Sequence, residues 1–154
     1  MGSCMIIRAM EPRELDSVLN LFNYYCEAAD ISEDKYDQDR ARETVREYCI
    51  RPNLFFRIAL NGQRPVGLIG GFLSQDPVET QVTATIQFLY LIPEFADIRS
   101  YQNLVDEFVT WSSQFKVTQI RAIDIGNKLD RLNDVYDELG FSPVRVSIMN
   151  KEIA

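Results

Sequence analysis

Apolar positions in the first third of the chain recur at helical spacing. Met5 to Met10 is a short apolar segment that predicts a strand, and Pro12 then opens a region in which apolar residues return every three or four positions. Proline costs little in a first helical turn, where its missing N–H would have no partner. A second helix with sparser apolar positions is predicted from about Asp37 to Ile50, ended by Arg51-Pro52-Asn53. The apolar stripe of the first helix comprises Leu15, Val18, Leu19, Phe22, Tyr25, Cys26 and Ala29.

The middle of the chain changes to patterns that are typical of β-strands. Leu54 to Leu60 is rich in Phe and Ile, and the Asn61-Gly62 pair after it predicts a hairpin because both residues tolerate a positive φ. Pro65 to Phe72 is the predicted return strand. We interpret its three glycines as a packing device rather than a ligand site; they are Gly67, Gly70 and Gly71.

The second half alternates strands with helices. Val82 to Ile92 begins with alternating polar and apolar residues and ends continuously apolar, as a strand covered on both faces does. Pro93 stops this strand, and a helix is predicted from about Arg99 to Gln114. The remaining predicted elements are a strand over Gln119–Ile125, a turn at Gly126-Asn127, a helix over Leu129–Leu139 that Gly140 ends, and a last strand over Phe141–Ile153.

These elements follow the order β-α-α-β-β-β-α-β-α-β. The early strands form antiparallel hairpins, whereas the helix between Val82–Ile92 and Gln119–Ile125 forms a crossover, which requires two parallel strands. The predicted class is therefore α/β (an α+β mixed sheet) with helices on both faces. A chain of 154 residues is large enough for one core and too short for two ordinary domains, so we expect residues 1–154 to form a single domain.

Composition and charge narrow the possible functions. The net charge is −7 and no run of Lys and Arg supplies a basic surface, so no nucleic-acid partner is expected. That charge serves either solubility or the attraction of a cationic partner. No apolar run approaches the roughly 20 residues that cross a bilayer, so we expect no membrane insertion. The sequence has no histidine, which excludes Ser-His-Asp and Cys-His catalysis and removes the commonest zinc ligand.

The three cysteines suggest a reducing compartment. Cys4, Cys26 and Cys49 are too widely spaced for a disulfide framework or a metal site, so we expect no metal. Cys26 and Cys49 fall on apolar helix faces, and both are expected to be buried free thiols. The N-terminus lacks the basic-then-apolar order of a secretory signal, so a cytoplasmic location is expected.

The element order and the Tyr-Asp-Glu-Leu-Gly-Phe segment at 136–141 carry a resemblance to a known family. From Ile6 to Ile153 the chain resembles the GNAT superfamily of N-acetyltransferases. In that family the fourth and fifth strands splay apart at a bulge, and acetyl-CoA lies in the opening. The resemblance implies that the pantetheine arm pairs with the backbone near the strand's end, where amides also polarise the thioester carbonyl. The matching residues here are Phe88, Leu89, Tyr90 and Leu91.

The family's coenzyme loop is not kept in this sequence. Its pattern, Gln/Arg-x-x-Gly-x-Gly/Ala, lets several N–H groups and a helix dipole converge on the diphosphate. The aligned segment has Ala96, Arg99 and Tyr101 at the diagnostic positions, and Asp97 adds a negative charge. We therefore expect weak or degenerate binding of acetyl-CoA. The resemblance carries over as coenzyme contacts the residues Arg99, Ser100, Tyr101, Gln102 and, farther along, Asn127.

Catalytic residues are also implied by the resemblance. Tyr136 matches the tyrosine that protonates the departing thiolate, which makes it the catalytic acid unless it is an inherited core residue. Glu94, near the strand exit, is the candidate general base. Other carboxylates near the expected cleft are Asp76, Glu79 and Asp124.

Two functions from different classes remain open. The first is an acetyltransferase of weak or degenerate activity that moves an acetyl group from acetyl-CoA to a small-molecule or protein amine. The second is a GNAT-fold binding module without catalysis, which acts on a protein partner as an inhibitor, adaptor or assembly factor. Small viral genomes carry diverged proteins of this kind, so a phage origin is compatible with either function.

Overall fold

The computed structural model describes residues 5–28, 36–75, 77–78, 80–123, 130–143, 149, 151 and 153. Its element order agrees with the predicted order from the first strand through the last predicted helix. The predicted last strand, Phe141–Ile153, lies largely outside the described residues. The elements are β1 (Met5–Arg8), α1 (Leu15–Ala28), α2 (Gln38–Ile50), β2 (Leu54–Asn61), β3 (Arg64–Gln75), β4 (Val82–Leu91), α3 (Ile98–Ser112), β5 (Val117–Ala122) and α4 (Asp130–Glu138), with 3-10 turns over Pro12–Glu14, Pro93–Phe95 and Ser113–Phe115.

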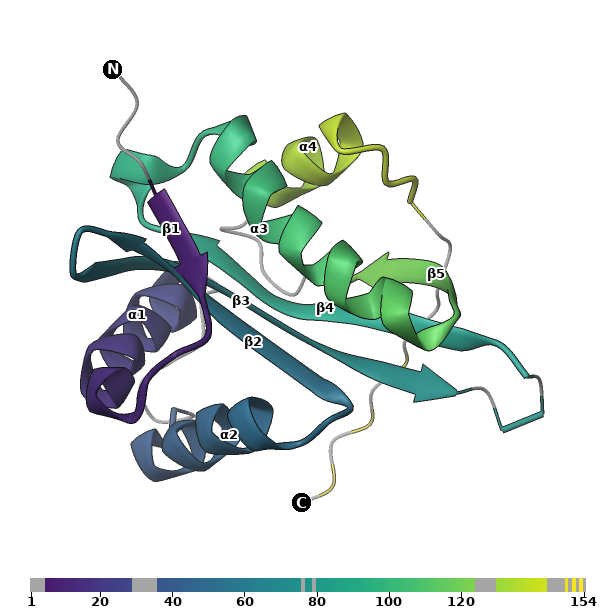
Figure 1. Cartoon of the computed structure of the whole chain (residues 1–154), viewed down its shortest axis with the longest axis horizontal. Helices are drawn as coiled ribbons and strands as arrows, with labels where there is room; N and C mark the ends of the chain where they lie inside the picture. Colours follow the sequence, from purple (N-terminus) through teal and green to yellow (C-terminus); the bar gives the residue numbers. More distant parts are fainter. Residues whose placement is uncertain are drawn as a thin grey trace.

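A five-stranded mixed sheet forms the centre of the molecule. Its strand order is β1-β2-β3-β4-β5. The first four strands pair antiparallel, and β4 pairs with β5 in parallel, as the crossover through α3 requires. Helices α1 and α2 cover one face of the sheet, and α3 and α4 cover the other (Figure 1). The predicted mixed sheet with helices on both faces is confirmed.

Side chains at predicted positions define where several elements begin and end. Asp37 caps α2 by accepting the backbone N–H groups of Asp39 and Arg40 at 3.0 and 3.2 Å. Gly62 adopts a φ of 65° in the hairpin between β2 and β3, so the predicted hairpin is present, but its turn residues are Gly62 and Gln63 because Asn61 ends β2 and pairs with Arg64. Helix α3 begins one residue earlier than predicted, at Ile98, because Asp97 caps it.

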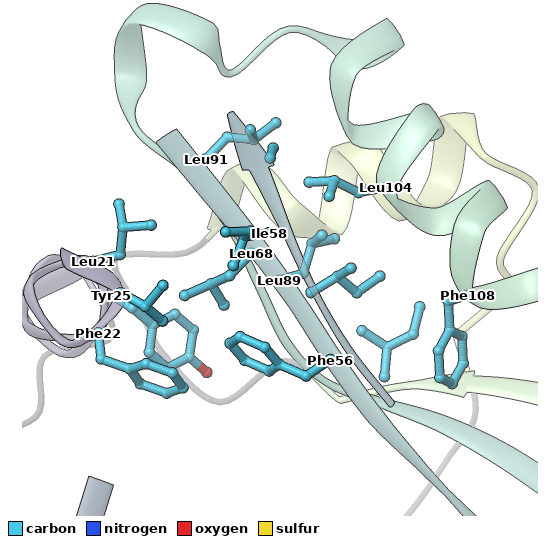
Figure 2. Packing of buried hydrophobic residues seen from close by; sticks show 14 of the residues in the cluster. Leu21, Phe22, Tyr25, Phe56, Ile58, Leu68, Leu89, Leu91, Leu104 and Phe108 are labelled. Carbon is cyan, nitrogen blue, oxygen red and sulfur yellow. The ribbon is translucent and has the colours of Figure 1, made fainter. Parts of the chain in front are cut away.

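The core lies on both faces of the sheet. Figure 2 shows Phe22 and Tyr25 of α1 close to Phe56 on one side, and Leu104 and Phe108 of α3 on the other. The contact with α3 depends on Gly71, since a Cβ there would collide with the Phe108 ring and with the backbone oxygen of Thr85. This confirms that the glycine serves close packing.

The cysteine prediction is wrong for one residue. Cys26 is half-buried and Cys49 is exposed, although both are free thiols. Cys49 lies in the last turn of α2. The buried residue of this helix is Val45, one turn earlier. Cys49 therefore continues the apolar stripe past the part of the helix that the core covers.

The described part of the chain lacks two kinds of feature. No helix in it is both long and apolar enough to span a bilayer. Within the same residues, no group of three or more Cys, Asp or Glu side chains is arranged to hold a metal ion.

Candidate active site at the open edge of β4

Strand β4 carries a bulge at Gln87. Gly71 of β3 opposes Ile86 and Gly70 opposes Phe88, so Gln87 is an extra residue without an opposing partner in β3. A bulge of this kind bends the strand, increases its local twist and changes the parity of the side chains that follow. The sequence of β4 turns from alternating to continuously apolar at this point, between Thr85 and Phe88.

The described part of β5 runs beside β4 as far as this bulge. The parallel register runs from Val82 opposite Val117 to Ile86 opposite Ala122. The final rung is the hydrogen bond from the Ile123 N–H to the Ile86 carbonyl oxygen, at 3.2 Å. Beyond it, β4 continues to Leu91, and the described residues of β5 offer no further partner. Within the described residues, the two strands are thus paired before the bulge, and no described residue of β5 pairs with β4 after it.

The register fixes which backbone groups face this opening. The Ile92 N–H donates to the Val66 carbonyl oxygen at 2.9 Å, and Tyr90 lies opposite Leu68. In an antiparallel pair, residues alternate between those that bond across the pair and those that point away from it. The N–H and C=O groups of Tyr90 therefore face β3, and those of Leu89 and Leu91 face the β5 side. An extended ligand that carries amides adds to such an edge as a further strand would.

This narrows the coenzyme contacts predicted from the sequence. The resemblance assigned the backbone of all four residues from Phe88 to Leu91, whereas alternation gives the open edge to Leu89 and Leu91 alone. The side chains of Phe88 and Tyr90 lie on the face of the sheet that α1 covers. The Phe88 ring lies 5.1 Å from Phe22, and the Tyr90 ring lies 6.3 Å from Tyr25.

Aromatic packing holds β4 in place behind the open edge. Phe88 also contacts Tyr48 of α2, with ring centroids 5.5 Å apart, so one side chain of β4 bridges both helices of that face. Leu89 and Leu91 are each only 2% exposed and face α3. Burial raises the pKa of Tyr90, and the nearby Glu27 carboxylate raises it further. The edge is therefore supported by packed side chains on both faces of the sheet, a condition for presenting backbone donors in a fixed geometry.

The start of α3, where a diphosphate would bind, contains a carboxylate of the protein itself. Asp97 is the N-cap residue, and its Oδ1 accepts the Ser100 N–H at 2.7 Å. This hydrogen bond holds the pKa of Asp97 below its ordinary value of 3.8. The Tyr101 N–H donates to the Asp97 carbonyl oxygen at 3.1 Å, so it is also engaged. Two N–H groups of the first turn are thus satisfied internally.

The same turn lacks the backbone shape of an anion nest. Among the described residues, positive φ values occur at Gly62, Lys116 and Gly140, none of them between β4 and α3. Tyr101 is 8% exposed and packs into the core, while Arg99 and Gln102 are exposed. The residues present therefore fit the amide-bearing arm of CoA at the β4 edge, and they do not fit its diphosphate at α3.

Tyr136 has a structural role at the end of α4. The Phe141 N–H donates to the Tyr136 carbonyl oxygen at 2.9 Å, and the Gly140 N–H donates to the Asp137 carbonyl oxygen at 3.1 Å. Gly140 has a φ of 93°, and the Tyr136 and Phe141 rings lie 5.2 Å apart. Together these contacts form a Schellman motif with its hydrophobic contact. The Tyr-x-x-x-Gly-Phe pattern is thus sufficient to end this helix, whatever the hydroxyl group does.

Some of the other predicted site residues are described by the structure, and others lie outside the described residues. Glu94 is exposed in the 3-10 turn that directly follows β4, at the end of the open edge. Tyr136 is 7% exposed on α4, which packs against α3 on the same side of the sheet. Sequence reasoning missed Gln87, whose signal is the change of pattern within β4. Four predicted residues lie outside the described ones: Asp76, Glu79, Asp124 and Asn127.

The chain matches known proteins by its structure and not by its sequence. No protein-family model and no curated protein sequence matches the chain. Solved structures do match: the aminoglycoside N-acetyltransferase AAC(6')-Iy in complex with a CoA bisubstrate analog has a TM-score of 0.80 at 16% identity, covering 99% of this chain and 100% of that one.

Two further structures extend the likeness. A predicted acetyltransferase from Clostridium acetobutylicum with acetyl-CoA gives a TM-score of 0.81 at 14% identity, covering 96% of both chains. The ribosomal-protein-alanine N-acetyltransferase of Brucella melitensis biovar Abortus 2308 gives 0.74 at 11% identity, covering 97% of this chain and 100% of that chain. At such identities the likeness shows a shared fold over the whole chain.

Proposed function

We propose that this chain, which has the GNAT acyl-CoA N-acyltransferase fold, is a weak N-acetyltransferase that moves an acetyl group from acetyl-CoA to an amine. The observation that carries the proposal is the open edge of β4. After the bulge at Gln87, the N–H and C=O groups of Leu89 and Leu91 face a side that β5 has left within the described residues. An enzyme of this class needs such an edge to align an acylated arm and to stabilise charge on the thioester carbonyl oxygen.

The chemistry needs few protein groups. The amine nitrogen attacks the thioester carbonyl carbon, the C–N bond forms and the C–S bond breaks, and the proton lost by the amine ends on the thiol. Backbone N–H groups of the β4 edge stabilise the oxyanion, and Tyr136 is the candidate donor to the sulfur. Exposed Glu94, at the end of the same edge, is the candidate acceptor of the amine proton.

Structural neighbours support both the donor and the acceptor classes. One neighbour is in complex with a CoA bisubstrate analog and another with acetyl-CoA, and a third is named for a ribosomal-protein alanine. We therefore propose a small-molecule or protein amine as acceptor, and the cytoplasm, where acetyl-CoA is made available, as the location. The net charge of −7 favours an acceptor that is cationic away from its reacting amine.

A second candidate function is favoured by one observation. The Asp97 carboxylate already occupies the cap of α3 through its bond to the Ser100 N–H. A chain that has lost coenzyme binding in this way would act through its surface on a protein partner, as an inhibitor, adaptor or assembly factor.

Calorimetry and turnover distinguish the two functions. Acetyl-CoA should bind with measurable heat, and thiol release should rise when cationic amines are added and fall in the Tyr136→Phe variant. The Asp106→Asn variant, changed at an exposed site on α3, is the control and should match the wild type. Absence of binding by acetyl-CoA and by shorter acetyl thioesters at millimolar concentration would leave the binding-module function in its place.

A further inference from the structure

We propose that the donor suited to this chain is an acyl thioester of pantetheine that lacks the diphosphate of CoA. The inference rests on the acyl transfer to an amine in the proposed function, and it replaces acetyl-CoA as the preferred donor. Two parts of one site support it. The β4 edge that would bind the pantetheine arm is present, whereas the Asp97 carboxylate occupies the start of α3, where the diphosphate would bind. Free acyl-pantetheine and the arm of an acyl carrier protein share this chemistry.

The arm has its full complement of partners at the β4 edge. Pantetheine contains two amides, and the edge offers a donor and an acceptor at Leu89 and again at Leu91. Those groups are held by side chains that are 2% exposed, so little order has to be gained when the arm binds. Nothing in this part of the site requires a phosphate.

The diphosphate meets an occupied helix end. A phosphate oxygen at the Ser100 N–H would have to displace the Asp97 Oδ1 atom, which lies at 2.7 Å. The Tyr101 N–H makes the first hydrogen bond within the helix, as in any α-helix, and the Tyr101 side chain is buried in the core. Displacement would also leave the carboxylate beside a second anion, which is unfavourable even near the surface.

Local and overall charge act in the same direction. The segment from Pro93 to Gln102 has two acidic residues, Glu94 and Asp97, and one basic residue, Arg99. The chain carries a net charge of −7. CoA, which has a diphosphate and a further ribose phosphate, is repelled by this field, whereas acyl-pantetheine is neutral and is not.

The transfer balances with either donor. The amine nitrogen bonds to the acyl carbon, the C–S bond breaks, and pantetheine leaves as a thiol that carries the proton from the amine. No oxidant, reductant or metal takes part. The absence of the diphosphate therefore does not alter the reaction.

A graded ligand series tests the proposal. In calorimetry of the full chain with S-acetyl-pantetheine, S-acetyl-4′-phosphopantetheine and acetyl-CoA, the first step adds one phosphate, and the second adds the further phosphates together with the adenosine. We expect neither phosphate-bearing ligand to bind more tightly than S-acetyl-pantetheine, and the affinity of acetyl-CoA to rise with added salt as repulsion is screened. A preference for acetyl-CoA over S-acetyl-pantetheine, whatever its dependence on salt, would overturn this inference and leave the proposed function intact. Failure of all three ligands to bind would overturn both.

One variant and one macromolecular donor complete the test. Asp97→Asn should tighten acetyl-CoA and leave S-acetyl-pantetheine unchanged, and an equal change for both ligands would contradict the proposed role of the carboxylate. An acetylated acyl carrier protein identifies the source. Tighter binding than S-acetyl-pantetheine indicates a carrier protein as the donor, and equal or weaker binding indicates a free thioester; both results support the shared chemistry.

Discussion

Replacing Asp97 by asparagine separates the charge at the start of α3 from the capping of the helix. Asparagine caps helices about as well as aspartate, so its side-chain oxygen can still accept the Ser100 N–H. The substitution removes one negative charge and leaves the fold in place. We expect acetyl-CoA to bind Asp97→Asn more tightly than the wild type.

The size of this effect follows from the geometry. The Asp97 Oδ1 atom lies 2.7 Å from the Ser100 nitrogen. A phosphate oxygen bound to a neighbouring N–H of the same turn would lie about 5 Å from that carboxylate, where two unit charges repel by about 0.8 kcal/mol in water and about 3 kcal/mol at an effective dielectric of 20. Asp97 is exposed, so the lower figure applies, and about 1 kcal/mol corresponds to a roughly fivefold lower Kd.

The assay is calorimetric titration with acetyl-CoA at low and high salt. The gain should shrink at high salt, where the Debye length falls to about 3 Å. Asp106→Asn removes the same charge from an exposed position farther along α3 and should change the Kd much less. An unchanged Kd in Asp97→Asn, or an equal gain in Asp106→Asn, would refute the argument that a local carboxylate opposes the diphosphate.

Three further predictions concern turnover and stability. If the Tyr136 hydroxyl is the acid, Tyr136→Phe should lower turnover about 100-fold or more with little change in Tm. Tyr136→Ala should also lower Tm, because the contact with Phe141 is lost. Unchanged turnover in Tyr136→Phe would make the residue purely structural. Gly71→Ala should destabilise the fold by about 1–3 kcal/mol, or about 2–4 °C in Tm per kcal/mol, through the collision with Phe108. In Gly62→Ala the added Cβ meets no atom within 4 Å and only the φ of 65° is strained, so this variant should lose less stability than Gly71→Ala. The reverse order of stability would contradict the packing argument. Asp97→Ala should remove a cap worth about 1 kcal/mol. The pKa of Asp97 in the folded state lies below its ordinary 3.8, so the difference in unfolding free energy between the wild type and Asp97→Ala should be constant above about pH 5 and shrink as the pH falls below 3.8. Urea unfolding at several pH values would measure this difference. A difference that grows toward acid pH would contradict the assignment.

The sequence was sufficient for the layout of the fold because its signals are local. Asp37 and Gly62 mark a helix start and a hairpin through their own conformational preferences. Pro93 ends β4, and the helix that follows requires a parallel return in β5. Each of these inferences depends on a few neighbouring residues, so no alignment was needed.

The details of the site depend on register, which is not local. The position of the bulge at Gln87 is defined by the residues of β3 that face β4, and a one-residue shift would give the open edge to Phe88 and Tyr90 instead of Leu89 and Leu91. The capping role of Asp97 was within reach of the sequence, because an aspartate directly before the first apolar residue of a helix, here Ile98, is a capping signal. Its negative charge was recognised, but its bond to the Ser100 N–H was not predicted.

The most direct test of the open edge is to follow backbone amides of β4 by NMR while S-acetyl-pantetheine is added. We expect the Leu89 and Leu91 amides to shift and become protected from exchange, while the Tyr90 amide, already paired with β3, stays as it was. Equal changes at all three amides, or changes elsewhere in the chain with none at Leu89 and Leu91, would contradict a thioester arm lying along this edge.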